Sequence, residues 1–510
     1  MLSKVTSYAL VGLEGVPVEV ETDINKGAVK YELVGLPDTA VKESRERVYS
    51  AIKNSSLRFP VNKITVNLAP ADIKKEGSQY DLPIAVSLLI ASGQLDADVE
   101  GTVLLGELAL DGALRPVTGI LPIIIAAKGK GFKKFIVPFG NANEASYIEG
   151  IEVYALKSLR DTYALLSGIE NFKPLEMRSF EAAKSRSNYD CDLKYVRGQA
   201  VAKRALEIAV AGGHNILLSG PPGTGKTMLA RCIPTIMPDM TFDEALEVTN
   251  ILSVSGELNE DGIMALRPFR TPHHTATTVS LCGGGTNKIR AGEISKAHRG
   301  VLFLDELPEY SRSALEALRQ PLEDGKITVT RVGGAITFPA DFILCASMNP
   351  CPCGNLGSAE RHCTCTPMQI RRYRAKISGP LLDRIDLQVE VDSVKYEELA
   401  SDREEECSAL VKKRVERARA IQRERFMGED GITVNADMGE KQIKAFCALS
   451  PDSEKILRSA FERLSLSARA RSRIIKVART IADLDLSEKI MPKHVLEATS
   501  YRNFDSTKER

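Results

Sequence analysis

The sequence has no tryptophan, and aromatic residues make up only 5% of its 510 residues. So few aromatic rings argue against a surface on which nucleic-acid bases stack one after another. The chain also lacks an excess of either charge, since 68 Lys and Arg stand against 67 Asp and Glu. Any contact with nucleic acid therefore has to come from a local basic patch.

No apolar run in the sequence is long enough to cross a bilayer. The longest, ILPIIIAA at 120–127, is far shorter than the roughly 20 residues that a membrane helix needs. The N-terminal MLSKVTSYALVGLEG has one lysine and an apolar run soon broken by acids, unlike a secretory signal. We therefore expect a cytoplasmic protein with no membrane partner, whose ten cysteines stay reduced and form no disulfide framework.

The composition that is present, 43% apolar and 26% charged, is ordinary for a soluble globular protein. A chain of 510 residues predicts roughly two to four domains. Residues 1–169 mix the two periodicities, which predicts an α+β domain. Strands are expected at 5–13, 18–24, 30–37, 63–70 and 133–138, helices at 38–55 (with Asp38 as N-cap), 81–95 and 119–131, and a hairpin over 102–117 that turns at Asp111-Gly112.

Residues 170–192 are polar and have no clear period, so we interpret them as a linker. From 193 the apolar strands NILLSG, GVLFLDE and DFILCASMN alternate with longer segments. This alternation predicts a parallel sheet flanked by helices over 193–392. From 393 to 510 the pattern is helical and charged.

A phosphate-binding loop is predicted at 220–227, where GPPGTGKT fills every position of G-x-x-x-x-G-K-[ST]. The loop follows an apolar strand and precedes a helix-like segment, so a chance glycine-rich loop is a poor alternative. Lys226 should reach the β- and γ-phosphates, and the Thr227 hydroxyl should bind Mg²⁺. The residues expected to hold the nucleotide are Gly220, Pro221, Pro222, Gly223, Thr224, Gly225, Lys226, Thr227 and Met228.

Two later strands end in polar residues that suit ATP hydrolysis. Asp305 and Glu306 follow VLFL, and they are expected to hold Mg²⁺ and to polarise the attacking water, respectively. Asn349 follows the strand FILCASM and is placed to hydrogen-bond the γ-phosphate or the water. Taken alone, the acids could face solvent and Asn349 could be a turn residue; the phosphate loop upstream favours the catalytic interpretation.

Four of the ten cysteines lie in NPCPCGNLGSAERHCTCTP, as the pairs Cys351/Cys353 and Cys363/Cys365. Two such pairs can supply the four thiolates of a tetrahedral structural Zn²⁺ site, and His362 could replace one thiol. Free thiols or a redox-labile pair are the alternative. With only protein ligands, such a metal would fix a loop and do no chemistry.

The series GPPGTGKT, VLFLDELPE, ILCASMNP and SGPLLDRIDL resembles AAA+ ATPases of the magnesium-chelatase-like branch. The chain as a whole is similar to the bacterial ComM/YifB-type family, including RPFRTPHHTA, GEIS and SARARSRIIKVARTIADL. The resemblance implies an AAA+ domain at 193–392, with the cysteine loop 351–365 inside it, and a helical lid at 393–510. In the family a proline-rich segment usually precedes GEIS, whereas this chain has TNKIRA.

The resemblance also implies roles for arginines. Arg384 in LLDRID matches the arginine finger that reaches the γ-phosphate of a neighbouring subunit, so a hexameric ring is implied. Arg469 best matches the sensor-2 arginine, with Arg471 and Arg473 as competitors. Without the family match, a local salt bridge for Arg384 and a solvated basic face for 469–479 would be favoured.

The segment GKITVTRVGGAITFP at 325–339 predicts a hairpin. It resembles a hairpin that projects into the central pore of related helicases. Arg331, next to the turn, and Lys326 are therefore the candidates for contact with a DNA backbone. An ordinary exposed hairpin with a solubilising arginine is an equal alternative.

Residues 1–169 resemble the proteolytic domain of Lon proteases, which has an S5-like fold. The nucleophile motif has become KEGSQYD, where Ser78 precedes the expected slot and Gln79 fills it. Leu121 and Ile123 stand where the family has lysines. Because a serine needs a base within hydrogen-bond reach, we expect an inactive peptidase fold that serves oligomerisation or DNA handling.

These expectations combine into a hexameric AAA+ motor that uses ATP and Mg²⁺ and acts on branched or single-stranded DNA. By resemblance, it would drive helicase action or branch migration during recombination of incoming DNA in natural transformation. Two alternatives stay open, namely an ATPase motor subunit of a magnesium chelatase and a Lon-like ATP-dependent protease. The missing Ser-Lys pair argues against the second.

Overall fold

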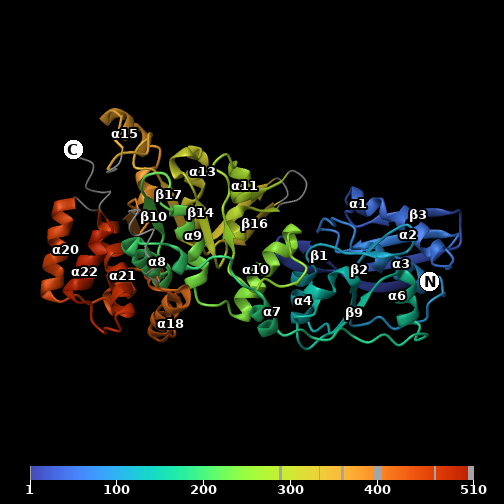
Figure 1. The fold of residues 1–510 in the computed structure, drawn as a ribbon. Coiled ribbons are helices and arrows are strands. Elements are labelled where there is room, and N and C mark those ends of the chain that lie inside the picture. The colour runs from blue at the N-terminus through green and yellow to red at the C-terminus, as the bar shows by residue number, and fades with distance from the viewer. Residues whose placement is uncertain are drawn as a thin grey trace. The chain divides into compact units, whose positions relative to one another are not determined.

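The structure is a computed structural model, and it describes residues 2–285, 290–331, 334–357, 361–393, 405–464 and 467–502. The chain divides into two compact units. The first contains residues 1–187 and 242–265, and the second contains residues 188–241 and 266–510 (Figure 1). Residues 242–265, which lie within the predicted ATPase region, thus belong to the N-terminal unit.

The first unit is built on a seven-stranded mixed sheet in the order β3-β4-β2-β1-β5-β8-β9. Antiparallel pairing joins β1 to β2 and β2 to β4, whereas β3–β4 and the β1–β5–β8–β9 run are parallel. The strands are β1 (Leu2–Val11), β2 (Glu14–Asn25), β3 (Lys30–Val34), β4 (Lys63–Ala69), β5 (Thr102–Leu104), β8 (Lys134–Pro138) and β9 (Glu152–Leu156). A short hairpin, β6 (Glu107–Leu108) with β7 (Leu114–Arg115), turns at the predicted Asp111-Gly112.

Helices cover both faces of this sheet and enclose two apolar cores. One core joins the sheet to α2 (Ser44–Asn54) and α3 (Asp81–Ala91), and the other joins it to α4 (Ile120–Gly129). Both α3 and α4 are apolar almost all round, as expected of buried helices. Asp38 caps α1 (Thr39–Lys42) as predicted, its side chain accepting from Val41 N. The unit also holds α5 (Ala142–Ala145), α6 (Leu159–Leu166) and α7 (Phe180–Arg186).

Helix α10 (Phe242–Ser255) completes the first unit, although it follows the ATPase helix α9 (Lys226–Ile236) in the chain. Leu246 of α10 packs on the core around α4. The Ser253 hydroxyl donates to the buried Glu144 carboxylate at 2.8 Å. Burial raises the pKa of Glu144, while hydrogen bonds from Asn141 and Ser253 oppose the shift. The helix is therefore anchored by both apolar and polar contacts.

The second unit is built on a five-stranded parallel sheet in the order β11-β14-β17-β10-β18. Every residue of β10, β14 and β17 is buried, which matches the continuous apolar runs in their sequences. The strands are β10 (Ile216–Ser219), β11 (Phe269–Arg270), β14 (Val301–Leu304), β17 (Ile343–Met348) and β18 (Leu387–Glu390). The predicted parallel-sheet core is confirmed.

Helices before and after the sheet share one core with it. Helix α8 (Ala200–Gly212) lies against β10, α9, α18 and α21, all of which are labelled in Figure 1. This core continues into the C-terminal helices, so the chain on both sides of residue 393 contributes to it. The C-terminal helices are α18 (Ser408–Arg425), α19 (Glu440–Phe446), α20 (Pro451–Leu464), α21 (Ala468–Leu484) and α22 (Pro492–Ser500).

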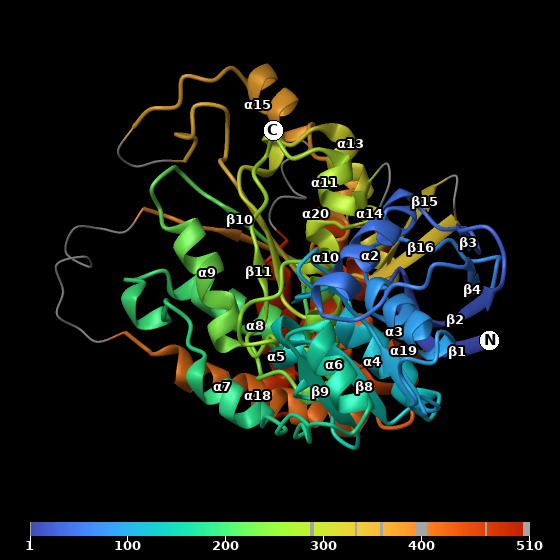
Figure 2. The same ribbon diagram turned by 90° about the vertical axis from the view of Figure 1, so that its right-hand side faces the viewer.

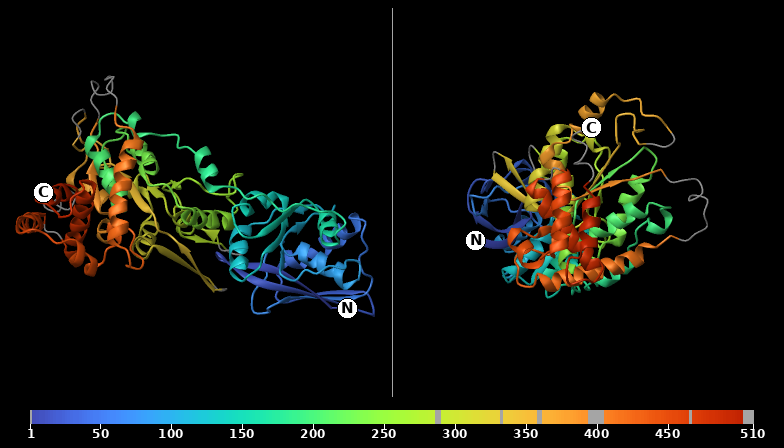
Figure 3. Two further views of the ribbon diagram at one scale, coloured as in Figure 1. Left: turned by 90° about the horizontal axis from the view of Figure 1, so that it is seen from below. Right: turned by 90° about the vertical axis from the view of Figure 1, so that its left-hand side faces the viewer.

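Short elements fill the connections of the second unit. The predicted hairpin is present as β15 (Lys326–Arg331) paired antiparallel with β16 (Gly334–Pro339), and Figure 3 shows it extending away from the sheet. Its turn residues, 332–333, and the TNKI part of the segment before GEIS, 286–289, lie outside the described residues. The other elements are α11 (Thr278–Cys282), β12 (Gly283–Gly284), β13 (Arg290–Ala291), α12 (Glu293–Lys296), α13 (Arg312–Ala317), α14 (Arg319–Asp324), α15 (Pro367–Arg374) and α16 (Gly379–Leu382).

Candidate nucleotide site

The phosphate loop links the central strand β10 to helix α9. Gly223 and Gly225 have φ angles of 82° and 83°, and no atom lies within 4 Å of a Cβ built on either. The loop therefore curls through a left-handed conformation around open space, as a cradle for phosphate oxygens requires. At the start of the loop, a Cβ on Gly220 would lie 2.1 Å from the Val391 carbonyl oxygen, so only glycine fits there.

Lys226 begins helix α9, and its ammonium group folds back over the loop. Its Nζ donates to the carbonyl oxygens of Gly220 at 2.8 Å and Pro221 at 2.7 Å. Burial lowers the pKa of Lys226, and the negative charges of Asp305 and Glu306 partly offset this effect. Phosphate oxygens are the natural replacement for these carbonyl acceptors, so the residues present fit a nucleotide.

Thr227 and Asp305 meet beside the loop. The Thr227 hydroxyl, in the first turn of α9, donates to Asp305 Oδ2, directly after β14, at 3.2 Å. Parallel strands bring their carboxyl ends to one edge of the sheet, which explains this meeting. A hydroxyl and a carboxylate in contact are the donor set that Mg²⁺ uses in P-loop enzymes. Thr227 and Asp305 would hold Mg²⁺ here, and the ion would supply positive charge against that of the phosphates.

Glu306 stands in a left-handed conformation, with φ 52° and ψ 50°, directly after Asp305. Its backbone N–H faces Asp305 Oδ1 at 3.1 Å and the Ser347 hydroxyl oxygen at 3.3 Å. Ser347, on β17, also donates a short hydrogen bond to Asp305. The carboxylate of Glu306 is about half exposed, with a relative accessibility of 53%. It is thus held at the sheet edge with its side chain open to a substrate water.

Sequence reasoning missed one partner of Glu306. His274, in the loop after β11, places Nδ1 3.7 Å from Glu306 Oε2. The RPFRTPHHTA segment was recognised only as part of the family resemblance. Nothing in its spacing says that the second histidine reaches a carboxylate more than thirty residues later in the chain. His274 is the added member of the site.

Asn349 follows β17, as predicted, at the same edge of the sheet as the phosphate loop, since Ser219 and Met348 are register partners. Its backbone hydrogen-bonds the hydroxyl of Tyr373 on α15. Burial raises the pKa of that hydroxyl to about 12, so Tyr373 stays neutral. The structure therefore brings Lys226, Thr227, Asp305, Glu306 and Asn349 to one edge of one sheet. Of the other loop residues, Thr224 is buried and Met228 is 43% exposed.

Arg384 lies elsewhere in the second unit. It is 4% exposed, donates to the Pro380 carbonyl at 2.6 Å, and makes a short ion pair with Glu323. Its Nε is buried without a hydrogen-bond partner among the described residues. Arg384 lines a pocket of about 280 Å³ together with the cationic side chains of Arg469, Arg473 and Lys476 and the acidic side chains of Glu323, Asp383 and Glu440. None of the Walker residues lines this pocket.

The three sensor-2 candidates on α21 have different surroundings. Arg473 pairs with the buried Asp386 at 2.5 Å, and Arg471 pairs with Glu454 at 3.3 Å. Arg469 shares the pocket with Arg384, and no ion pair to it is found in the part of the chain that the structure describes. Of the three, Arg469 is therefore the one whose charge is available.

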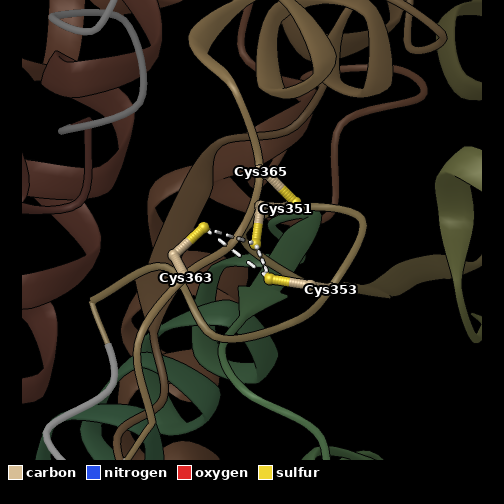
Figure 4. A group of neighbouring side chains, drawn as sticks. All are labelled: Cys351, Cys353, Cys363 and Cys365. Carbon is tan, nitrogen blue, oxygen red and sulfur yellow. Dashed lines mark hydrogen bonds between the residues drawn. The ribbon is translucent and has the colours of Figure 1, made fainter.

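The four predicted metal ligands come together (Figure 4). The sulfur atoms of Cys351, Cys353, Cys363 and Cys365 all lie within 4.8 Å of one another. Cys351 Sγ is 3.4 Å from Cys353 Sγ and 3.6 Å from Cys363 Sγ. Tetrahedral zinc with Zn–S bonds of about 2.3 Å separates its sulfurs by roughly 3.8 Å. The cluster fits a metal of this kind, and His362 is not part of it.

Backbone groups already favour one thiolate in this cluster. Hydrogen bonds from the backbone of Asn355 and Thr364 lower the pKa of Cys353 to about 5. Burial, and the negative charge shared among neighbouring sulfurs, raise the pKa of Cys365 to about 12. Several thiolates this close together need a cation to coexist.

The hairpin candidates for DNA contact lie at opposite ends of β15. Lys326 is exposed at the start of the strand, opposite Pro339, and Arg331 ends it, opposite Gly334. The Arg331 side chain lies outside the described residues. At about 3.3 Å a residue, the two positions are roughly 16 Å apart, so they would contact different parts of a nucleic acid.

In the first unit, Ser78 donates a short hydrogen bond to the Glu107 carboxylate. Leu121 and Ile123 are each 1% exposed inside α4. The buried Lys75 ammonium donates to the Pro70 carbonyl, and no lysine hydrogen-bonds Ser78 among the residues that the structure describes. This geometry offers a carboxylate, and no amine, to the serine.

The fold and the site together define a P-loop ATPase of the AAA+ type. Family models agree, since "Magnesium chelatase, subunit ChlI" matches residues 192–399 and its C-terminal model matches 405–502. A further model, "Subunit ChlI of Mg-chelatase", matches 20–141. Competence protein ComM of Haemophilus influenzae is 44% identical over 506 residues, covering 98% of this chain and 97% of ComM. The chain therefore belongs to the ComM/YifB family of magnesium-chelatase-like proteins.

One further relative supports this placement, and a Lon protease matches part of the chain. The uncharacterized protein YifB of Escherichia coli is 45% identical over 509 residues, covering 99% of this chain and 97% of YifB. Lon protease 2 of Bacillus subtilis is 29% identical over 140 residues, which is 27% of this chain and 24% of that protease. Among the described helices, none is both long and apolar enough to cross a membrane. The cytoplasmic location stays a prediction.

Proposed function

We propose that this protein is an ATP-hydrolysing ring motor that moves along DNA, in helicase action or branch migration during recombination of incoming DNA. The observation that carries the ATPase part is the meeting of Lys226, Thr227, Asp305 and Glu306 at one sheet edge. ATP would supply the free energy and Mg²⁺ would bridge its phosphates. The chain's own groups would grip the phosphates and orient the attacking water.

Each side chain has a distinct task in this scheme. Lys226 exchanges its two carbonyl acceptors for phosphate oxygens, and Thr227 and Asp305 hold the cation between them. Glu306 orients and deprotonates the water, and Asn349 hydrogen-bonds the water or the γ-phosphate. A site of this kind acts mainly by positioning and by neutralising charge.

The arginine pocket supports action between subunits. Arg384 and Arg469 line one pocket whose lining includes no Walker residue, so we propose that they serve the nucleotide of a neighbouring subunit. Arg384 must then leave Glu323 when a neighbour docks. Because each site needs a residue from the next subunit, a closed ring follows, and a hexamer is the proposed assembly.

The DNA step rests on the hairpin and on a relative. The β15–β16 hairpin extends from the sheet, and its exposed Lys326 and terminal Arg331 would contact the DNA backbone. One relative identical at 44% bears the name "Competence protein", which supports a role in uptake or recombination of DNA. The proposed partner is branched or single-stranded DNA.

We assign structural Zn²⁺ to Cys351, Cys353, Cys363 and Cys365, since their sulfurs are spaced for a tetrahedral ion. The first unit is proposed to have no peptidase activity, since its serine faces a carboxylate and apolar residues fill the lysine positions. It would serve as a platform for oligomerisation or DNA.

A second candidate is a motor subunit of a magnesium chelatase, which the matching family models favour. The near full-length match to ComM and YifB, at 44% and 45% identity, favours the DNA motor over it. The two candidates differ in what stimulates hydrolysis, since only a DNA motor responds to DNA.

The test is ATP hydrolysis by the purified full chain with no DNA, duplex, single-stranded and four-way junction DNA. We expect DNA to stimulate hydrolysis, and Glu306→Gln to lower turnover by about 10²–10⁴-fold while ATP still binds. Strand displacement or junction movement that needs ATP completes the case. Hydrolysis that all three DNAs leave unchanged, with no binding at low salt, would contradict the DNA function and leave the chelatase motor.

A further inference from the structure

The cysteine cluster lies next to the nucleotide site along the chain. Asn349 directly follows β17, and Cys351 lies two residues later, fully buried. The loop contains Cys353, Cys363 and Cys365 and is followed by α15, which is labelled in Figure 2. A metal bound by these thiolates would therefore fix the first residues after Asn349.

The loop also touches the phosphate loop directly. Gly354, one residue after Cys353, is buried with a φ angle of 79°, and a Cβ built on it would lie 2.7 Å from Cδ of Pro222. Pro222 is a residue of the phosphate loop, two positions after Gly220. The backbone of the cysteine loop thus packs against the outer side of the cradle, with no room for a side chain between them.

Helix α15 closes the far end of the same loop. Tyr373 receives its hydrogen bond from the backbone of Asn349, and the Arg374 guanidinium lies 3.4 Å from the Pro350 carbonyl oxygen. The start of the loop, at Asn349 and Pro350, and helix α15 at its end are therefore in contact. A stretch this rich in small and polar residues has little apolar surface to hold it in place, and Cys351 is its one fully buried apolar side chain among the described residues.

We propose that the cysteine cluster, when it binds metal, is a clamp that positions the nucleotide site. The metal would hold Cys351 and Cys353, and through Gly354 and Asn349 it would fix Pro222 of the cradle and the polar end of β17. This inference rests on the proposed zinc site and ATPase, and it adds a dependence of ATP affinity on the metal. Gly354 acts as a positioning residue and does not contact the nucleotide.

The chain offers a matched pair of variants to test the contact. Gly354→Ala would press a methyl group onto Pro222. Gly357→Ala, in the same loop with a φ angle of 80°, has the same backbone strain but no atom within 4 Å of its Cβ. We expect Gly354→Ala to raise the Kd for a fluorescent ATP analogue by about tenfold, since small displacements in a positioned site cost this much. Gly357→Ala should bind the analogue like the unchanged protein.

Zinc content is measured by mass spectrometry on each protein. This measurement distinguishes a failure of the clamp from a failure of the zinc site or of the ATPase proposal. Weaker ATP binding by Gly354→Ala at unchanged zinc content supports the clamp. Equal Kd values for the Gly354→Ala, Gly357→Ala and unchanged proteins overturn it, even where all three hold zinc and hydrolyse ATP.

The metal itself provides the second measurement. Zinc would be removed from the full chain with a mercurial reagent and a chelator, and the thiols then regenerated and Mg²⁺ restored. We expect the zinc-free protein to bind the ATP analogue about tenfold more weakly, and added ZnCl₂ to restore the Kd. An unchanged Kd after metal removal overturns the clamp. Purified protein without any metal would instead contradict the zinc proposal, while the glycine pair still tests the packing contact.

Discussion

At the scale of single residues, His274 has the most direct consequence for the reaction. It is the side chain that lies 3.7 Å from the Glu306 carboxylate, which must orient the attacking water. Its neighbour His273 instead hydrogen-bonds Thr275 within its own loop, at 2.9 Å. The two rings also stack on each other, with 4.1 Å between their centroids, but only His274 is placed against Glu306.

We predict that His274→Ala lowers kcat for ATP hydrolysis by about tenfold, because the carboxylate loses a partner that limits its orientations. The KM for ATP should change little, since His274 does not touch the phosphate loop. The comparison variant is His273→Ala, which removes a ring that stacks on His274 at 4.1 Å between centroids but leaves the Glu306 contact, so it should lower kcat less than His274→Ala does. Equal kcat for the two variants would contradict a role for His274 in positioning Glu306.

Asp386 carries a second prediction at this scale, on stability and pH. Burial alone would raise the pKa of Asp386, but the charge of Arg473, the hydrogen bond with His214 and the charge of Arg502 outweigh it and hold that pKa far below the usual range. A carboxyl group with a depressed pKa contributes stability that is complete above its unfolded pKa, about 3.9, and is lost as the pH falls below that value. Asp386 also joins the ATPase core to helix α21 through Arg473.

We therefore predict that Asp386→Asn lowers the free energy of unfolding by roughly 3–5 kcal/mol at pH 7, the cost of leaving buried cations unpaired. The variant should also lose less stability than the unchanged protein between pH 4 and 3. Denaturant titrations followed by circular dichroism at several pH values measure both effects. Asp430→Asn, at an exposed position, is the control and should match the unchanged protein at every pH.

At the scale of elements, α10 belongs to the first unit, although its sequence lies within the predicted ATPase region. After α10, the returning segment packs so closely that a Cβ on Gly262 would lie 2.3 Å from the Asn143 carbonyl carbon. Gly262 also has a φ angle of 79°, so it meets both a conformational and a steric requirement. The docking of this segment depends on that glycine.

We predict that Gly262→Ala lowers the melting temperature of the first unit, because the added methyl forces the segment away from Asn143 and loosens α10. The cost should be about 1–3 kcal/mol beyond the strain of placing alanine at positive φ. Gly101→Ala supplies the control, with a φ angle of 71° and no atom within 4 Å of its Cβ. Calorimetry of the full chain compares the two variants, and equal melting temperatures would contradict the prediction.

Elements whose burial follows a simple period were predictable from sequence. The strands around the phosphate loop, the capped helix after Asp38 and the buried helix at 81–91 have runs or alternations that identify them. Helix α7, inside the polar stretch 170–192, was not predicted, because none of its residues is buried and it therefore shows no apolar period. The docking of α10 was also missed, since its apolar face does not say which core it joins.

The residues of the candidate site also divide into those that the sequence predicts and those that it does not. Residues in a motif, such as Lys226 and Asp305, were found because their spacing encodes the chemistry. His274 and Gly354 were not, because each acts through a contact with a residue distant in sequence. The ion pair between Arg473 and Asp386 was likewise not predictable from the sequence. Because this pair occupies Arg473, it favours Arg469 over Arg473 as the sensor-2 candidate.

At the scale of the whole molecule, the proposed ring makes a prediction about Arg384. The phosphate loop has its own lysine, and the pocket of Arg384 and Arg469 includes no Walker residue in its lining. Arg384 forms an ion pair with Glu323 of its own chain. In the proposed ring, Arg384 would exchange this partner for the phosphates of a second copy.

Mixed assemblies test this idea with two inactive variants. Glu306→Gln lacks the group that orients water but keeps Arg384, and Arg384→Ala lacks the finger but keeps Glu306. If Arg384 acts on a neighbour, mixing them in equal amounts creates sites with an intact Glu306 from one subunit and an intact Arg384 from the next. We therefore predict that the mixture hydrolyses ATP faster than either variant alone, with a rate that falls on dilution as the rings dissociate. The control is a protein that carries both substitutions. It should not hydrolyse ATP, because every site in its assembly lacks both Glu306 and Arg384. A mixture no more active than its parts, formed under conditions where the subunits co-assemble, would place Arg384 in the site of its own chain and remove the reason for a ring.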